Sequence, residues 1–139
     1  MKVIKTCLGI VSILMMLSAC NNVDHPIAGH TYVNDNRIWM RQYGQPYKSS
    51  GMVTHLHFYS TGKMEMEVRL YEDGSSTPHM TKTYKHFNYD IEGNTIVVSH
   101  DYSVYWKSTV RGTEDERYVY NSKENSLMST NGTLYDFLY

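Results

Sequence analysis

The chain has 139 residues, of which 41% are hydrophobic, and 13 basic residues stand against 14 acidic ones, so its formal net charge is −1. This length suits one compact domain and leaves no room for a second of ordinary size. The charge balance argues against nucleic acid as a partner, because domains that bind nucleic acid carry a basic excess.

The first twenty residues have the pattern of a secretory signal. Lys2 and Lys5 precede an apolar stretch at residues 7–17, and small residues follow before Cys20. The tetrad Leu-Ser-Ala-Cys at residues 17–20 resembles the signal of bacterial lipoproteins. The resemblance implies that Cys20 carries a diacylglycerol on its sulfur and an acyl chain such as palmitate on its new amino group. An uncleaved transmembrane helix over residues 3–19 is the alternative, but Lys5 interrupts this segment, which is shorter than the roughly twenty apolar residues that a span needs.

This signal divides the chain into a signal peptide at residues 1–19, a lipidated tether at 20–26 and a domain at 27–139. Two or three acyl chains hold a protein to a membrane almost permanently, so we expect Cys20 to anchor the domain in the bacterial cell envelope. Asn21 stands where enteric lipoproteins kept at the inner membrane have aspartate, which favours the outer membrane. Loss of two leader lysines from 13 basic residues leaves 11 against 14 acidic ones, a net charge of −3, and no cysteine pair remains for a disulfide.

From residue 27 onward, apolar and polar residues alternate with a period near two, as in half-buried strands. The clearest two strands are expected at residues 52–58 and 64–70. A three-residue loop from Ser60 to Gly62 pairs Phe58 with Met64, whereas a two-residue loop would set Phe58 against Glu65. The longer loop keeps apolar residues on one face and puts Gly62 where a left-handed residue is wanted.

Two more hairpins are marked by turn dipeptides. Gly-Asn at 93–94 joins residues 87–91 to 96–98, and Asn-Gly at 131–132 joins residues 126–130 to 133–139. Further strands are expected at 29–33, 102–110 and 117–121, while residues 36–43 fit either a strand or a short helix. About eight strands joined by short turns predict an all-β fold. It is an antiparallel meander closed as a lipocalin-like up-and-down barrel or, alternatively, a β-sandwich.

Three stretches carry a resemblance to a known family. They are Gly-His-Thr-Tyr at residues 29–32, Leu-His-Phe-Tyr-Ser-Thr-Gly-Lys at 56–63 and Phe-Asn-Tyr-Asp-Ile-Glu-Gly-Asn-Thr-Ile at 87–96. Together with the lipidation signal, these residues resemble the small lipocalin-like lipoproteins common in Bacteroidetes, over most of residues 27–139. The resemblance implies a barrel more than a task, since most members of such families have no known function.

His55 and His57 have the spacing of a metal-ligand pair, because alternate residues of a strand share a face. The hairpin register sets His57 opposite Glu65 and His55 opposite Glu67. Two histidines and two carboxylates could hold zinc. The favoured interpretation is a solvent-facing ladder of opposite charges, since a zinc site needs three or four converging ligands.

The aromatic residues, 13% of the chain, could line a cavity at one end of the barrel or fill its interior. If a ligand cavity exists, the strand phase predicts walls from one face of three strands. These residues are Leu56, Phe58, Met64, Met66, Phe87, Tyr89 and Ile91.

No nucleophile elbow, phosphate-binding glycine loop or zinc-protease motif occurs in the sequence, so we expect neither catalysis nor a cofactor. The leading hypothesis is a membrane-anchored lipoprotein that binds a small apolar or amphipathic ligand in or at the mouth of the barrel. The alternative is a non-enzymatic module with a filled core that binds or inhibits an envelope protein through loops at residues 72–79 and 112–116.

Overall fold

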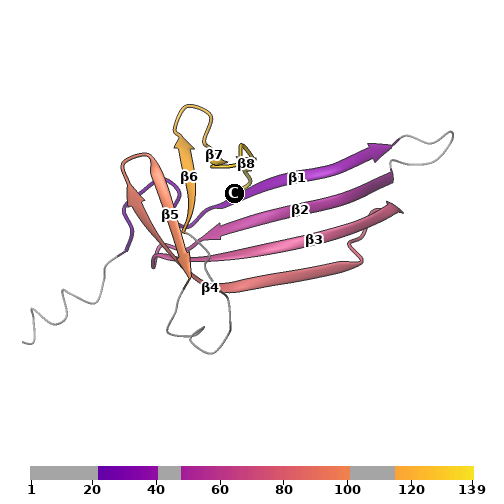
Figure 1. Cartoon of the computed structure of the whole chain (residues 1–139), viewed down its shortest axis with the longest axis horizontal. Coiled ribbons are helices and arrows are strands. Elements are labelled where there is room, and N and C mark those ends of the chain that lie inside the picture. The colour runs from indigo at the N-terminus through magenta and orange to yellow at the C-terminus, as the bar shows by residue number, and fades with distance from the viewer. Residues whose placement is uncertain (1–21, 41–47, 101–114) are drawn as a thin grey trace, which may run out of the picture.

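The computed structural model describes residues 22–40, 48–100 and 115–139, and their regular secondary structure is all β. Eight antiparallel strands follow one another as neighbours and close into a barrel, because β1 pairs with both β2 and β8 (Figure 1). The strands are β1 (Thr31–Met40), β2 (Lys48–Phe58), β3 (Lys63–Ser75), β4 (Met80–Glu92), β5 (Thr95–His100), β6 (Glu116–Asn121), β7 (Ser126–Ser129) and β8 (Leu134–Phe137). The predicted all-β barrel is confirmed, and the sandwich is not formed.

The registers predicted for the hairpins are confirmed. Phe58 pairs with Met64 across the β2–β3 turn, and Gly62 in that turn has a φ of 80°. In the β4–β5 hairpin, Ile91 pairs with Ile96. These registers follow from the strand period, because a slip of one residue would turn every apolar side chain out of the core.

The core lies where the barrel is closed. Its side chains come from all eight strands except β8 and are at most 3% exposed: Ile27, Tyr32, Leu56, Phe58, Met64, Tyr89, Ile96, Val98, Tyr118 and Leu127. Ile27 precedes β1. Aromatic rings meet edge to face within it, as Phe58 does with Tyr32 and with Tyr89 at centroid distances of 6.1 and 5.1 Å. Each such contact stabilises the fold by about 0.5–1.5 kcal/mol beyond the free energy gained from burying apolar area.

Polar side chains stabilise the closure of the barrel. The hydroxyl of Tyr32 on β1 donates to Asn125 Oδ1 at 2.8 Å, and the hydroxyl of Tyr120 donates to the same oxygen at 3.1 Å. Asn125 ends the β6–β7 turn with a φ of 49°, a left-handed conformation that asparagine tolerates better than most residues. One amide therefore links β1 to β6 and to the β6–β7 turn.

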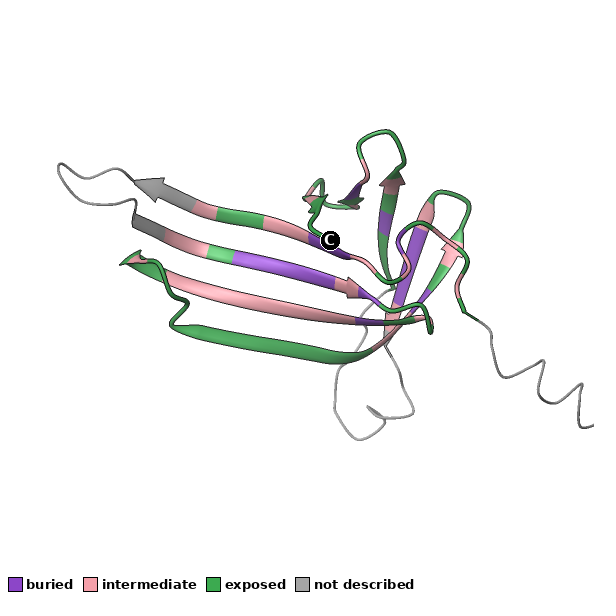
Figure 2. Cartoon of the chain, turned by 180° about the vertical axis from the view of Figure 1, so that it is seen from behind, coloured by how far each residue is buried: buried purple, intermediate pink, exposed green. Residues whose placement is uncertain are grey.

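Four strands continue beyond the closed part as an open sheet. β1 pairs with β2 over ten residues but with β8 only at Tyr32 and Val33. β4 pairs with β5 only from Phe87 onward, so the stretch of β4 before it has β3 as its partner among the described residues. Figure 1 shows β1 to β4 running on together, away from β5 to β8, and Figure 2 shows that burial along them decreases with distance from the barrel.

Residues 36–40 belong to β1, so the strand alternative is correct for this stretch and the helix alternative is wrong there. Gly51 allows β1 and β2 to approach closely: its φ is 122°, and a Cβ added to it would stand 2.7 Å from the carbonyl oxygen of Asn36. The strand predicted at 102–110 lies outside the described residues. No helix suited to spanning a membrane occurs in the described part of the chain.

Candidate functional site

The open sheet presents one face that continues directly from the barrel core. Residues opposite one another in antiparallel strands share a face, so the registers define three cross-strand rows over β1, β2, β3 and β4. From the barrel outward these rows are Tyr32–Leu56–Met66–Tyr84, Asn34–Thr54–Val68–Lys82 and Asn36–Met52–Leu70–Met80. We call these twelve residues the inner face. At strand and residue spacings, they cover roughly 13 by 14 Å.

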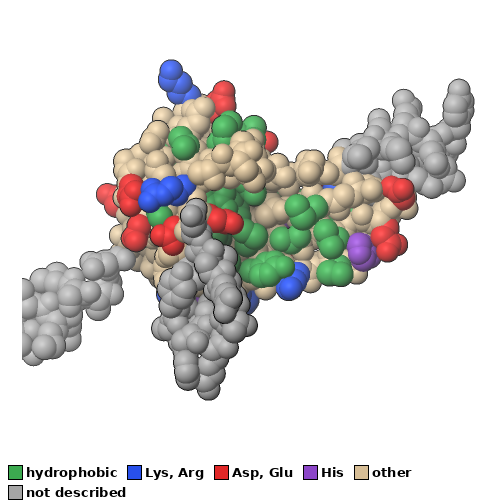
Figure 3. All heavy atoms as spheres, viewed as in Figure 1, with side chains coloured by type: hydrophobic (Ala, Val, Ile, Leu, Met, Phe, Trp, Pro, Cys, Tyr) green, Lys and Arg blue, Asp and Glu red, His purple; other side chains and the backbone are tan. Residues whose placement is uncertain are grey.

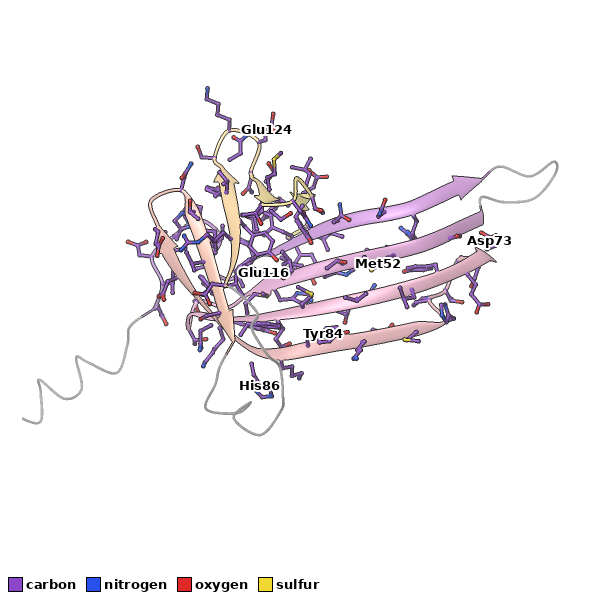
Figure 4. The ribbon with its side chains drawn as sticks, viewed as in Figure 1. Met52, Asp73, Tyr84, His86, Glu116 and Glu124 are labelled. Atoms are coloured by element: carbon purple, nitrogen blue, oxygen red, sulfur yellow. The ribbon has the colours of Figure 1, made fainter. Side chains whose placement is uncertain are left out.

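The inner face is largely apolar, and much of it is open to solvent. Met52 is 40% exposed, Met80 49% and Tyr84 37%, whereas Tyr32 and Leu56 in the first row are fully buried. Figure 3 shows hydrophobic side chains gathered over β2 to β4 on this side, and Figure 4 shows Met52 and Tyr84 on the same side of the sheet. An exposed apolar patch continuous with a core is typical of a binding surface.

A β-bulge in β4 is what brings Tyr84 to this face. Met64 pairs with Phe87 but Met66 pairs with Tyr84, so β4 carries one more residue than β3 over this interval. His86 within the bulge has a φ of 70°. The extra residue reverses the phase of the strand. After the bulge Phe87 faces the core, and before it the even-numbered residues Met80, Lys82 and Tyr84 face the same way.

A pocket of about 120 Å³ lies where the inner face meets the barrel, and Met66 belongs to both. Its other lining residues are Glu116, Arg117, Tyr118, Ser129, Thr130, Asn131 and Tyr135. The Tyr118 hydroxyl donates to Glu116 Oε2 at 2.6 Å. Burial, and then this bond to a carboxylate, raise the pKa of Tyr118, so the phenol stays protonated. The guanidinium of Arg117 pairs with Glu92 Oε2 at 2.9 Å. The pocket therefore offers hydrogen-bonding groups, the Glu116 carboxylate and this paired guanidinium to a polar group of a ligand.

Four of the seven residues predicted as cavity walls are core side chains. Leu56, Phe58, Met64 and Tyr89 are 0–2% exposed and pack on one another or on their neighbours. Burial raises the pKa of Tyr89 to about 12, and its hydroxyl donates to the carbonyl oxygen of Tyr59. Side chains thus fill the interior at these positions.

The other three predicted wall residues are partly buried and pack against the core: Met66, Phe87 and Ile91. Among them, Met66 alone lies on the inner face and lines the mouth pocket.

His55 and His57 lie on the opposite face of β2, opposite Glu67 and Glu65 as expected. Their rings stack in parallel at 6.1 Å, and His57 Nδ1 is hydrogen-bonded to Thr31 Oγ1 at 2.9 Å. His55 is 8% exposed, its Nδ1 stands 3.8 Å from Glu67 Oε1, and burial lowers its pKa. Within the described residues, no group of three or more potential ligands is arranged to hold a metal ion.

A larger hollow of about 400 Å³ lies near the bulge, between Tyr59, Lys63, Met64, Glu65, Lys85, His86 and Phe87. Its polar groups interact with one another or with neighbours: Lys63 donates to Asn88 Oδ1 at 2.6 Å, and Glu65 accepts from Tyr59 and pairs with Lys85. Groups satisfied in this way gain little from a ligand, so the inner face is the stronger candidate.

The sequence carried a signal for the inner face that the predicted wall residues do not include. Apolar residues of β4 lie at positions 80 and 84 and then at 87, 89 and 91, and this change from even to odd numbers indicates a bulge between them. Met52, Leu70 and Met80 were missed as site residues because their phase alone does not reveal that β5 to β8 leave them uncovered.

Comparison with known family models, with curated protein sequences and with solved structures finds no match to this chain.

Proposed function

We propose that this protein is a lipid-anchored, non-enzymatic binding protein of the bacterial cell envelope, related to the small lipocalin-like lipoproteins. Its ligand is a small amphipathic molecule that lies on the inner face, at the mouth of the barrel. The observation that carries the proposal is the exposure of Met52, Met80 and Tyr84 at 37–49% on a surface continuous with a sealed core. Covering these side chains would remove apolar area from water, at about 25 cal/mol per Å².

The filled interior favours the mouth over the interior as the place of binding. Leu56 and Phe58 are at most 1% exposed, so a ligand inside the barrel would have to displace core side chains. A ligand on the inner face needs no such rearrangement. Its polar end can reach the mouth pocket, where Tyr118 and Glu116 lie beside Met66.

Native mass spectrometry of the mature chain carrying Cys20→Ser, expressed in a bacterial host, tests the proposal. We expect a co-purifying small molecule that Met80→Asp removes, because a carboxylate in the outer row would be desolvated by the apolar part of the ligand. Met128→Asp is the matched control, since Met128 is 48% exposed against 49% for Met80 but lies on β7. Equal loss of ligand in both variants, or no ligand in repeated preparations, would refute the proposal.

The anchor is tested separately. Globomycin treatment should block processing at Cys20, and Cys20→Ser should move the mature protein from the detergent phase to the aqueous phase. Unchanged processing and partitioning would remove the anchor from the proposal and leave the binding surface in place.

A protein-interaction or inhibitor module is the second candidate. It is favoured by the exposed turn between β3 and β4, where residues 76–79 are all exposed. Capture of an envelope protein that depends on residues 72–79, with the inner-face variant Met80→Asp still active in capture, would support it over ligand binding.

A further inference from the structure

Lys82 is the one charged residue among the three cross-strand rows of the inner face. Lys82 lies in the middle row beside Val68, and its ammonium nitrogen stands 4.8 Å from the centroid of the Tyr84 ring. The acidic residues of β3 in this part of the sheet, Glu65 and Glu67, alternate to the opposite face. No ion pair to Lys82 occurs among the described residues.

A cation in this position constrains what can cover the apolar surface. An uncharged chain lying across Val68 and Tyr84 would exclude water from the ammonium group without replacing its hydration, which is costly. An anionic group would compensate that loss and gain a charge-assisted hydrogen bond. A cationic group would add repulsion.

Glu116 sets the direction of the ligand. Its carboxylate lines the mouth pocket next to Met66, in the first row, and the guanidinium of Arg117 in the same lining pairs with Glu92 at 2.9 Å, so an anion is disfavoured at that end. Lys82 lies one row further out, on β4, which is the last strand of the open sheet among the residues that the structure describes. The two charges therefore favour an uncharged or hydrogen-bonding part at the mouth and an anion at β4.

We propose that the ligand of the inner face is a single-chain anionic amphiphile whose carboxylate or phosphate contacts Lys82. The inference rests on the proposed function and adds the sign and place of the charged group. Met52, Met66 and Met80 supply half of the six apolar side chains of the face outside the fully buried core, and their flexible thioethers adapt to an apolar chain of variable shape.

The occupant is a free amphiphile and not the anchoring bilayer. The amide of Val23, close to the predicted anchor, donates to the carbonyl oxygen of Ser60 at the β2–β3 turn. Met52 lies eight residues back along β2, roughly 26 Å from that turn at about 3.3 Å per residue. The inner face thus extends away from the end of the barrel where the anchor attaches.

The test is titration calorimetry of the mature chain carrying Cys20→Ser with four ligands that share one tail, each below its critical micelle concentration. These are decanoate, decyl phosphate, decanol and decyltrimethylammonium. We expect the two anions to bind about three- to fivefold more tightly than decanol, as for a partly exposed ion pair, and the cation to bind most weakly. Comparison of the two anions identifies the preferred head group.

Lys82→Met removes the charge while keeping an apolar side chain of similar length. It should lower the affinity for both anions and leave decanol binding at least as tight as before, because no ammonium group is then desolvated, so the preference for anions is lost. Lys123→Met makes the same change of charge in the exposed β6–β7 turn and should alter none of the affinities.

The outcomes separate the inference from the proposed function. If all four ligands bind equally, or if Lys82→Met leaves anion binding unchanged, the inner face binds ligands but the negative charge assigned to the head group is wrong. If no tail binds, the proposed function fails as well. Sedimentation of the Cys20→Ser chain with phosphatidylglycerol vesicles, lost in Lys82→Met, would overturn the free amphiphile in favour of a bilayer surface.

Discussion

Replacing Gly51 by alanine should destabilise the protein far more than the same change at Gly93. Both glycines have positive φ values, 122° and 66°, which side chains rarely adopt. They differ in the space around them. A Cβ at Gly51 would stand 2.7 Å from the Asn36 carbonyl oxygen and 3.2 Å from the Arg37 Cα, both backbone atoms, whereas a Cβ at Gly93 has nothing within 4 Å.

The expected loss has two parts. The unfavourable backbone conformation costs about 1–3 kcal/mol at either position, offset by roughly 0.4–1 kcal/mol because alanine has less freedom than glycine in the unfolded chain. Gly51→Ala adds overpacking against the backbone of β1, about 1–3 kcal/mol more. We therefore expect a loss of about 1 kcal/mol for Gly93→Ala and about 3 kcal/mol for Gly51→Ala, out of a total stability of about 5–15 kcal/mol.

Urea unfolding followed by far-ultraviolet circular dichroism measures both losses. Equal losses for the two variants would show that β1 and β2 do not approach as closely at Gly51 as the structure has them. A lower m-value for Gly51→Ala, with the midpoint unchanged, would also contradict the reasoning, because it would mean that the open sheet unfolds apart from the barrel.

Three further changes test the packing and electrostatics of the barrel. Leu56→Ala should lower the free energy of unfolding by about 2–5 kcal/mol, because Leu56 is fully buried. Leu134→Ala, at a 40% exposed position, should lower it by under about 1 kcal/mol. Similar losses for the two variants in urea unfolding would contradict the assignment of Leu56 to the core. Tyr32→Phe should cost about 0.5–1.5 kcal/mol in the same assay by removing the bond to Asn125, and no change would mean that this bond adds nothing to closure. Burial lowers the pKa of His55 below its ordinary 6.5, so as the pH falls the unfolded chain binds a proton at this residue before the folded chain does. The free energy of unfolding of the wild type should therefore fall by up to about 1.4 kcal/mol per pH unit below pH ~6.5. His55→Gln should lack this component, and a difference between the two chains that stays constant from about pH 8 to pH 5 would refute it.

Local patterns predicted the hairpins because the strand period leaves little choice. Pairing Phe58 with Glu65 would have buried a carboxylate. The register with Met64 could therefore be predicted from the order of apolar and polar residues alone. The length of β1 could not, since residues 36–43 fit two periods, and residues 36–40 form a strand by pairing with β2. Closure as a barrel was predicted, but the strand pattern could not decide between a barrel and a sandwich, because closure depends on just two positions at which β8 meets β1.

The candidate site was harder to predict than the fold. The sequence identified the apolar faces of β2 and β3, but which part of each strand would be covered depends on where β5 and β8 begin. Leu56 and Met52 have the same phase on one strand, yet one is fully buried and the other is 40% exposed. Exposure of that kind is a property of the assembled barrel and has no counterpart in a single strand.

The bulge of β4 determines which residues of that strand line the binding surface. Without the bulge, the same sequence would alternate uninterrupted from Phe87 backward and bring Thr81, Thr83 and Lys85 to the ligand side in place of Met80, Lys82 and Tyr84. Two hydroxyls would then replace a thioether and an aromatic ring with no substitution in the chain. Ligand selectivity therefore depends on the backbone conformation at His86 as well as on the side chains of the surface itself.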